Sequence, residues 1–474
     1  MLEKIDRDLL SSVARYLRRV ERLATDDEPE EPTPLGAVIS EHLGSDAAQA
    51  PLLTEPISEH RFIDADIALA EMAGTGRLIG VTGGEQRFHV SVVELMANRH
   101  VRFAPGPVSY EARATGPDTE RRVVAFGVRL FHFGGDPIAV VQRAAAHRYG
   151  RETGQFEILC ADPEVAGRVV IELRRSMVER SVLRGKVLSF TPTQFGAEAG
   201  ATFLPRPDVP EEAVVLEPGV LDAIVAHVVG IGEQREALLA AGQHLKRGVL
   251  LYGPPGTGKT LTVRHLLSRT PDATAVVLTG PGIQFITQAA EIARMFAPAI
   301  VVLEDVDLVA MERGSSPQPL LFEVLDALDG LNADADVAFV MTTNRVEVLE
   351  RALAERPGRV DLGVEVPLPD ASSRRRLFHR YAAGLPFSDA ALDAAADRAE
   401  STTGSFAKEL MRRSVLAAAL RDAEAVPTDD DLSAALDELL SSSAALTRQL
   451  LGSGAEEDAA EDPDEEHLVA DFRR

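Results

Sequence analysis

The segment Gly253 to Thr260 reads Gly-Pro-Pro-Gly-Thr-Gly-Lys-Thr and brings together residue types that bind phosphate. Its spacing follows G-x-x-x-x-G-K-[ST], a loop whose backbone N–H groups and following helix N-terminus surround phosphate oxygens. In this pattern Lys259 reaches the β- and γ-phosphates, and Thr260 gives its hydroxyl to Mg²⁺. An ordinary glycine-rich turn would not explain why one of only five lysines occurs at this position. The predicted binding residues for ATP and Mg²⁺ are Gly253, Pro254, Pro255, Gly256, Thr257, Gly258, Lys259 and Thr260.

Three acidic residues, Glu304, Asp305 and Asp307, follow the apolar run Ala299 to Leu303. Such a run of Ile, Val and Leu is typical of a strand that is buried on both faces, so charges at its end need compensation. The carboxyl edge of an open parallel sheet is also where ligands bind. We therefore expect these acids to lie beside the phosphate loop, where a carboxylate can hold a cation or act as a base. The alternative is that they only cap the end of the strand.

The elements that must position these residues are five apolar runs of strand length, separated by segments long enough for helices. The runs are 248–252, 275–279, 299–303, 337–343 and 363–368. Alternation of two-sided hydrophobic strands with helices indicates a parallel sheet that is covered by helices. After Pro369 the sequence becomes almost wholly helical. The predicted fold class is α/β, with a five-stranded parallel P-loop core and a C-terminal helical lid.

The amino-terminal part of the chain has a different pattern. Residues 2–24 carry apolar side chains at helical spacings of three and four, and an acidic, proline-containing linker follows them. Strand-like and helix-like segments then alternate without a recognisable catalytic cluster, which predicts an α+β domain. The predicted domains are 1–34 (helix and acidic linker), 35–190 (α+β domain for substrate or partner recognition), 210–369 (large α/β subdomain), 370–452 (helical lid) and 453–474 (disordered acidic tail).

Composition narrows the class of protein. The chain has 474 residues, of which 45% are hydrophobic, as expected for a soluble protein of several domains. The net charge of −25 makes nucleic acid an unlikely partner. No apolar run approaches the roughly 18 to 20 residues needed to span a bilayer. Cys160 is the only cysteine and no secretory signal is visible, so the expected compartment is a reducing cytoplasm.

Residues 210 to 425 resemble the AAA family of ATPases, P-loop NTPases of the AAA+ superfamily, in the phosphate loop, the acidic strand end and the segment FVMTTNRVEVLERALAERPGRVDLGVEVPLPD. The family usually has Asp-Glu-x-Asp where this chain has Glu304-Asp305-Val306-Asp307. The same exchanged order occurs in the branch that resembles the mitochondrial Rieske-protein translocase. With Asp307 fixing the register, the resemblance implies that Glu304 contacts Mg²⁺ and that Asp305 activates the attacking water. The base is then one methylene shorter than usual.

Residues after the acidic strand match further positions of the family. Asn344 matches the polar sensor that orients the water or contacts the γ-phosphate. Arg356 and Arg359 match arginines that a neighbouring subunit inserts into the site, where a guanidinium stabilises the transition state of phosphoryl transfer. The alternative for these arginines is a surface ion pair. Action in trans implies a closed homo-oligomeric ring, with six subunits as the family norm.

Three further assignments concern the pore and the lid. Phe285-Ile286 matches the aromatic-aliphatic pair that projects into the pore of substrate-threading rings, although Thr287 replaces the usual glycine and Phe285 could instead be a packing residue. Residues 311–319 would form a second pore-facing loop. Lys408, in the lid, could contact phosphate or remain a solvated helix charge. The adenine pocket is expected to include Val228 to Gly232.

Two hypotheses for the function follow from these patterns. The first is a Mg²⁺-dependent ATPase that assembles as a ring and uses ATP hydrolysis to remodel, unfold or translocate a protein substrate recognised by the amino-terminal region. The alternative is an ATP-gated assembly or scaffold module that switches partner binding without threading a polymer. A DNA-remodelling role is disfavoured by the net charge.

Overall fold

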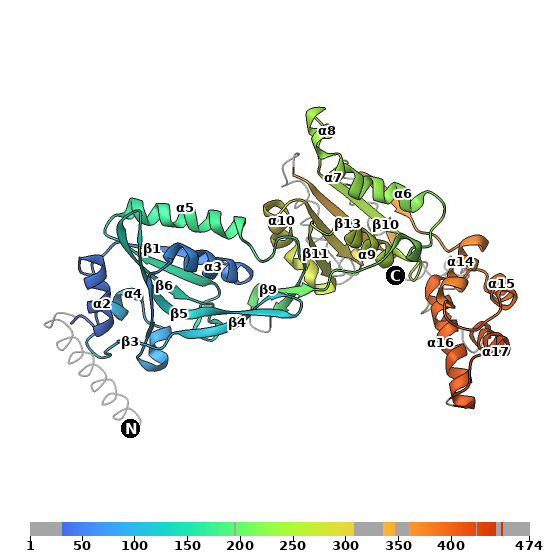
Figure 1. The fold of residues 1–474 in the computed structure, drawn as a ribbon, viewed down its shortest axis with the longest axis horizontal. Helices are drawn as coiled ribbons and strands as arrows, with labels where there is room; N and C mark the ends of the chain where they lie inside the picture. The colour runs from blue at the N-terminus through green and yellow to red at the C-terminus, as the bar shows by residue number, and fades with distance from the viewer. Residues whose placement is uncertain are drawn as a thin grey trace, which may run out of the picture. The chain divides into compact units, whose positions relative to one another are not determined.

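The computed structural model describes residues 31–193, 196–307, 335–346, 360–422, 424–441 and 447–448 (Figure 1). Packing divides the chain into two compact units. The first is built mainly from residues up to Ser181, and the second mainly from Val182–Pro192 and the residues from Ala199 onward. Three predicted features lie outside the described residues: the helix over 2–24, the loop over 311–319 and the acidic tail over 453–474.

The first unit contains an antiparallel sheet with helices packed on it. Its strands run in the order β1-β7-β6-β5-β2-β3, and β4 pairs with β5. Helix α3 packs against α5, α5 packs against β1, and α2 packs against β6. The strands are β1 Leu52–Ile57, β2 Arg77–Val81, β3 Pro105–Gly106, β4 Ser109–Gly116, β5 Thr119–Phe133, β6 Asp136–Arg143 and β7 Gly154–Leu159. The α-helices are α2 Pro34–Leu43, α3 Phe62–Ala73, α4 Val92–Met96 and α5 Pro163–Glu179.

Local sequence explains how this unit begins. The hydroxyl of Thr33 accepts a hydrogen bond from the backbone N–H of Gly36 at 3.0 Å and thereby caps α2. The helix then buries Leu35 and Ile39 completely, in one apolar cluster with Phe126 of β5. Helices packed on an antiparallel sheet give this region the α+β character that was predicted for it.

The second unit contains the predicted parallel sheet, in the order β14-β10-β13-β12-β11-β8-β9. Strands β14, β10, β13, β12 and β11 are parallel neighbours, which confirms the predicted five-stranded core. The strands are β8 Val187–Thr193, β9 Gly196–Leu204, β10 Arg247–Tyr252, β11 Thr274–Thr279, β12 Ala299–Glu304, β13 Val337–Thr343 and β14 Leu362–Glu365. The α-helices around it are α6 Val220–Val225, α7 Ile231–Glu233, α8 Arg235–Ala240, α9 Lys259–Arg269 and α10 Ile286–Met295.

One strand of the parallel sheet comes from the region that the sequence pattern assigned to the amino-terminal domain. Strand β8 pairs in parallel with β11, and Val187 lies opposite Ala275. Its side chains Val187, Leu188 and Phe190 are buried. Because these apolar residues find their partners in the second unit, residues 182–192 pack there, whereas the pattern extends the first domain to residue 190.

A helical subdomain follows β14, as predicted, and is drawn in orange and red in Figure 1. Its helices are α14 Ala371–Tyr381, α15 Asp389–Arg398, α16 Gly404–Arg421 and α17 Asp429–Leu440. Each begins at a residue whose side chain accepts a backbone N–H of the first turn, and these caps are Asp370, Ser388, Thr403 and Thr428. Their buried faces share one apolar core around Phe378, Phe406 and Leu436.

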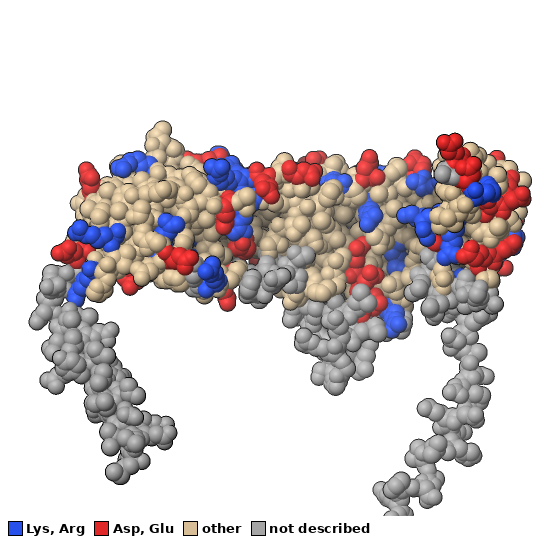
Figure 2. Space-filling view, turned by 90° about the horizontal axis from the view of Figure 1, so that it is seen from below, with Lys and Arg blue, Asp and Glu red and all other residues tan. Residues whose placement is uncertain are grey.

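The surface of the described residues carries both signs of charge. Figure 2 shows lysine and arginine interspersed with aspartate and glutamate on the face that it presents. That face therefore offers none of the broad basic areas that track a phosphate backbone, as far as its coloured residues show. Within the described ranges, no helix combines the length and the apolar character needed to cross a bilayer.

Candidate functional site

The phosphate loop connects the end of β10 to the first residue of α9. Gly253 has a φ of +139°, and a Cβ at this position would lie 2.3 Å from the carbonyl oxygen of Val366. Only glycine fits there, because both the backbone conformation and the close approach exclude a side chain. Gly256 and Gly258 also have positive φ values, of 79° and 114°. The loop therefore turns tightly into the helix, whose first N–H groups are free to face an anion.

Lys259 is held inside this loop with 6% of its surface exposed. Its Nζ donates hydrogen bonds to the carbonyl oxygens of Gly253 and Pro254, each at 2.7 Å. Burial lowers the pKa of Lys259 to about 8, and the nearby charges of Asp305 and Asp307 oppose that shift. A phosphate oxyanion beside Nζ would favour the charged form further. The loop thus orients the ammonium group, and an anionic ligand would stabilise its charged form.

A cavity of about 450 Å³ lies beside the loop. Residues of the loop and of α9 line it on one side, and Asp305 and Asn344 line it from the ends of β12 and β13. The lid helices α14 and α16 and the segment Val214–Leu216 supply the remaining walls. The volume lies within the usual range of pockets that hold small ligands. The predicted residues Lys259, Asp305 and Asn344 therefore meet at one cavity.

Glu304 ends β12 and is hydrogen-bonded to the side chain of Thr260 in the first turn of α9. Burial raises the pKa of Glu304, and the Thr260 hydrogen bond opposes that shift. The charge of Asp305 raises this pKa further, whereas Arg264 lowers it. Arg264 lies one helical turn after Thr260 and also lines the cavity. A hydroxyl and a carboxylate, the oxygen donors that Mg²⁺ prefers, are thus adjacent.

Asp305 has an unusual backbone conformation, with a φ of +52°. Its backbone N–H donates to Oγ1 of Thr342 at 3.1 Å. Its Oδ1 accepts a hydrogen bond from Nδ2 of Asn344 at 3.2 Å. The predicted base and the predicted sensor are therefore in direct contact, and both line the cavity.

Asp307 is buried and plays a structural part. Its Oδ1 accepts hydrogen bonds from Oγ1 of Thr343 at 2.9 Å and from the backbone N–H of Asn344 at 3.2 Å. These bonds tie the segment after β12 to the end of β13. The third acid of the Glu304-Asp305-Val306-Asp307 run therefore holds the sensor in register, while Glu304 contacts Thr260 and Asp305 lines the cavity.

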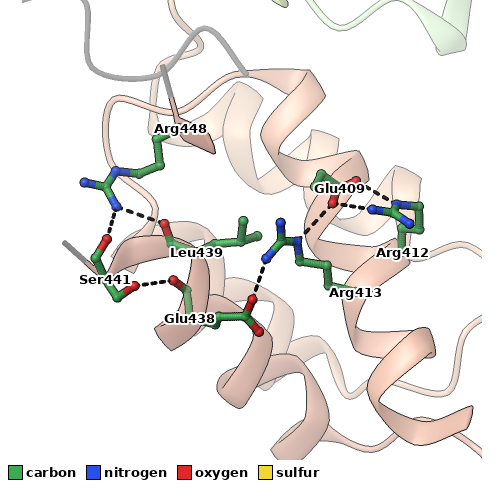
Figure 3. Close-up of polar contacts among 7 residues, drawn as sticks. All are labelled: Glu409, Arg412, Arg413, Glu438, Leu439, Ser441 and Arg448. Atoms are coloured by element: carbon green, nitrogen blue, oxygen red, sulfur yellow. Dashed lines mark hydrogen bonds and ion pairs between the residues drawn. The ribbon is translucent and has the colours of Figure 1, made fainter. Parts of the chain in front are cut away.

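Lys408 reaches the same cavity from α16 of the lid. The carboxylate next to it in sequence, Glu409, accepts hydrogen bonds from Arg412 at 2.7 Å and from Arg413 at 2.9 Å (Figure 3). Those contacts lower the pKa of Glu409 to about 2. Arg413 also donates to Glu438 of α17 at 2.6 Å. Arg413 therefore links α16 to α17, while Glu409 is engaged by two arginines of its own helix.

Several residues that line the cavity were not predicted from sequence. Val214, Val215 and Leu216 form one apolar wall, and Leu377 and Tyr381 of α14 form another. Burial raises the pKa of Tyr381, since it disfavours the charged phenolate. The four-residue spacing of Leu377 and Tyr381 was a signal that both share a helix face. An adenine ring fits between apolar walls of this kind.

The segment predicted for the adenine pocket lies elsewhere. Val228 and Val229 are buried in the core between β10 and α9, and they are not among the residues that line the cavity. The carbonyl oxygen of Val228 accepts a hydrogen bond from Nε of Arg247 at 2.8 Å. Their apolar character therefore reflects packing in the core, and the apolar residues that line the cavity from the segment before β10 are Val214–Leu216.

The predicted pore pair is also buried. Phe285 is 2% exposed and Ile286 is 0% exposed. The ring of Phe285 packs against Phe190 of β8, with centroids 6.1 Å apart. Of the two roles that the sequence left open, Phe285 therefore has the packing role. A side chain enclosed within its own chain does not project into a pore.

Replacing Phe285 with alanine is expected to lower the free energy of unfolding by about 3 kcal/mol, because it opens a cavity beside Phe190. Urea denaturation measures the change. The exposed neighbour Gln284 provides the control, and Gln284→Ala should shift stability little. A fully stable Phe285→Ala protein that has lost substrate processing would contradict this assignment and restore the pore role.

Arg356 and Arg359, the predicted arginine fingers, lie outside the described residues. Their role therefore stays a prediction. All other predicted site residues are described, and the structure brings Lys259, Thr260, Asp305, Asn344 and Lys408 to one cavity.

Comparison with known proteins agrees with this geometry. The profile of the ATPase family associated with various cellular activities (AAA) matches residues 249–368, which contain the phosphate loop, the acidic strand end and Asn344. The particular likeness to the Rieske-protein translocase branch, which rests on the order of two acids, stays a prediction.

Three curated relatives share part of their length with this chain. An ATP-dependent zinc metalloprotease FtsH 2 of Sphaerobacter thermophilus is 34% identical over 242 residues, 48% of this chain and 36% of the relative. A 26S proteasome regulatory subunit 4 homolog of Dictyostelium discoideum is 35% identical over 158 residues, 30% of this chain and 36% of the relative. The 26S proteasome regulatory subunit 6A of Encephalitozoon cuniculi is 31% identical over 238 residues, 44% of this chain and 59% of the relative.

This chain thus spans between 36% and 59% of the length of these relatives. The family profile covers the part of the chain that holds the phosphate loop. Residues 249–368 of this chain therefore form an AAA ATPase domain, which contains the phosphate loop, the acidic strand end and Asn344.

Proposed function

We propose that this protein is a Mg²⁺-dependent ATP hydrolase that works as a homo-oligomeric ring and remodels protein substrates. The observation that carries the hydrolytic part is the meeting of Lys259, Asp305 and Asn344 at one cavity of about 450 Å³. Phosphoryl transfer needs positioning and charge stabilisation above all, and these three groups supply an ammonium, a carboxylate and an amide at one place.

Each residue has a distinct part in the proposed reaction. Lys259 binds the β- and γ-phosphates, because its Nζ is fixed within the loop by two carbonyl oxygens. Asp305 accepts a proton from the attacking water, and Asn344 orients that water beside it. The apolar walls formed by Val215 and Tyr381 enclose the base of the nucleotide.

The residues present fit a magnesium ion. Thr260 and Glu304 place a hydroxyl and a carboxylate in hydrogen-bond contact at the start of α9. Among the described residues, no group of three or more His, Cys, Asp or Glu side chains forms a complete metal cage. Mg²⁺ does not need one, since it usually takes one or two protein oxygens, substrate phosphates and water. When bound, the ion would neutralise charge on the phosphates.

The lid supports nucleotide sensing. Lys408 lines the cavity from α16, while its neighbour Glu409 is engaged by two arginines. Gly404, at the start of the same helix, lies close to the phosphate loop, because a Cβ there would be 3.6 Å from the carbonyl oxygen of Gly256. We therefore assign Lys408 a contact with phosphate that couples the lid to the nucleotide.

The names of the relatives support the proposed substrate class. One is named an ATP-dependent zinc metalloprotease and others are named 26S proteasome regulatory subunits, names that connect ATP use with proteins as substrates. We propose a hexameric ring in the cytoplasm, a protein substrate and its recognition by the α+β unit, residues 35–190. Nucleic acid and membrane partners are not part of the proposal.

The alternative, an ATP-gated assembly module, makes a different prediction for a nonhydrolysable ATP analogue. Under the alternative, the analogue alone would switch partner binding as well as ATP does. Remodelling needs turnover, so under the proposed function a client protein changes conformation with ATP but not with the analogue.

Lys259→Ala tests the proposed site directly. We expect the variant to bind Mg²⁺-ATP roughly 100-fold more weakly, because about 3 kcal/mol of charge-assisted hydrogen bonding to phosphate is lost. Calorimetric titration measures the affinity, and phosphate release measures the accompanying loss of turnover. The matched control is Lys186→Ala, which should bind Mg²⁺-ATP normally. Lys186 is exposed and directly precedes β8. An affinity within threefold of the wild-type value would contradict the assignment.

A further inference from the structure

We propose that Thr342 is a positioning residue for ATP hydrolysis, because its hydroxyl fixes the backbone of Asp305 in the conformation that presents the carboxylate to Asn344 and the cavity. This inference rests on the proposed function. It concerns a residue of β13 that lies one strand away from the acid on which it acts. Thr342 is 1% exposed, so it acts through Asp305 and not by touching the substrate.

The conformation of Asp305 needs an explanation. Its φ of +52° is one of two positive values for non-glycine residues among those that the structure describes. The left-handed region costs an L-residue roughly 1–2 kcal/mol and is kept only where surrounding contacts enforce it. Such strain at a cavity wall is a common feature of functional sites.

The contact that enforces this conformation comes from Thr342. The β12–β13 ladder pairs residues up to Leu303 opposite Met341. Beyond that pair, the N–H of Asp305 donates to the side-chain oxygen of Thr342 at 3.1 Å. The turn after the strand is therefore anchored by a hydroxyl at the point where strand pairing ends.

The end of β13 makes the arrangement specific. Thr342 lies within β13, and Asn344 directly follows its last residue. Thr342 holds the backbone of Asp305, and Asn344 holds its carboxylate at 3.2 Å. Thr343, which points to the opposite face of β13 from Thr342, donates instead to Asp307 at 2.9 Å. Thr342 thus contacts the backbone N–H of the proposed base, and Asn344 contacts its carboxylate.

The contact between Thr342 and the backbone of Asp305 matters because the side chain of the proposed base is short. Aspartate has one methylene fewer than the glutamate that the family usually has at this place, so its carboxylate reaches less far from the backbone. A longer side chain can correct a backbone shift by rotation about an extra bond, but aspartate cannot. The position of the backbone at Asp305 therefore decides where the carboxylate lies relative to the attacking water.

The test compares Thr342→Val with Thr342→Ser. Valine keeps the shape but removes the acceptor, whereas serine keeps the hydroxyl. We expect Thr342→Val to lower kcat roughly 10- to 100-fold with KM within about threefold, because a misplaced base affects the chemical step and not binding. Thr342→Ser should stay within about threefold of wild type. Thr274→Val is the matched control, since it removes another buried hydroxyl bond, to the carbonyl oxygen of Phe296, and should lower stability without lowering kcat.

Two further measurements separate positioning from general damage. Hydrogen exchange in a peptide that spans residues 303–307 should quicken in Thr342→Val and not in Thr342→Ser, because only the former loses the acceptor of the Asp305 N–H. In an Asp305→Asn background, Thr342→Val should cause no further loss of the residual turnover.

The outcomes distinguish this inference from the proposed function. A wild-type protein with no more turnover than Lys259→Ala would refute the proposed function itself. Turnover in the wild type that Thr342→Val leaves unchanged would overturn only the positioning role of Thr342. That role would also be overturned if Thr342→Val caused an equal loss in the Asp305→Asn background, or if Thr342→Ser were as impaired as Thr342→Val.

Discussion

Replacing Asp305 with asparagine is expected to lower ATP turnover by ~10²- to 10⁴-fold, the usual contribution of a positioned base, while Mg²⁺-ATP affinity stays within about threefold. Asparagine is nearly isosteric with aspartate and tolerates the positive φ of +52° at this position. The backbone bond to Thr342 is therefore kept, and only the proton acceptor is lost. Phosphate release at saturating ATP gives kcat, and calorimetric titration gives the affinity.

Lys259→Ala is the necessary comparison for this variant. It should lose binding and turnover together, because Lys259 contacts phosphate in the ground state as well as in the transition state. Asp305→Asn should separate the two, with ATP bound and not hydrolysed. Normal turnover by Asp305→Asn would show that another group activates the water, and would remove the assignment of the exchanged acids.

Local patterns in the sequence are sufficient to predict the core of the fold. Runs such as Val249–Leu251 and Ile300–Leu303 are apolar throughout, as parallel strands covered on both faces must be, and the phosphate loop marks where the first of them ends. Strand β8 cannot be placed in this sheet from sequence, because its partner β11 lies about 85 residues later and long-range pairing leaves no local signal.

The role of Phe285 stays open in the sequence because strand β8 cannot be placed from local patterns. The motif around it suggests a pore as long as no partner for the ring is visible nearby in the sequence. The structure supplies one in Phe190, which lies on β8. An aromatic residue next to a loop is equally suited to a pore or to a core, and only the position of a distant strand decides between them.

The candidate site also contains residues that local patterns predict and residues that only tertiary packing places. Lys259, Asp305 and Asn344 could be placed together because Asp305 and Asn344 directly follow strands of one parallel sheet and Lys259 ends the loop after a third, and the carboxyl ends of these strands share an edge. The apolar walls at Val215 and Tyr381 could not, since they come from a connecting segment and a lid helix whose approach depends on tertiary packing. Chemistry at strand ends is therefore predictable, whereas the shape of the pocket around it is not.

Removing the arginine finger is expected to have the largest effect of any substitution considered. Alanine at Arg356 or Arg359 should lower kcat by ~10³- to 10⁵-fold with ATP binding retained, because the guanidinium stabilises charge only in the transition state of phosphoryl transfer. Arg375→Ala is the matched control, because this lid arginine pairs with Asp397 at 2.9 Å on the surface and should turn over ATP normally. If both variants keep full activity, neither arginine acts as a finger, and the alternative of surface ion pairs holds for both.

Mixing of variants tests whether the finger acts on a neighbouring subunit. A subunit with Lys259→Ala cannot bind ATP well but keeps its arginines, and a subunit with Arg356→Ala or Arg359→Ala keeps its phosphate loop. In a mixed ring, some interfaces join the intact loop of one subunit to the intact arginine of the other. Turnover of the mixture should therefore exceed the sum of the two separate proteins, at several mixing ratios. A mixture that is only the sum of its parts would mean that the arginines act within their own subunit, and the ring would then have no catalytic role.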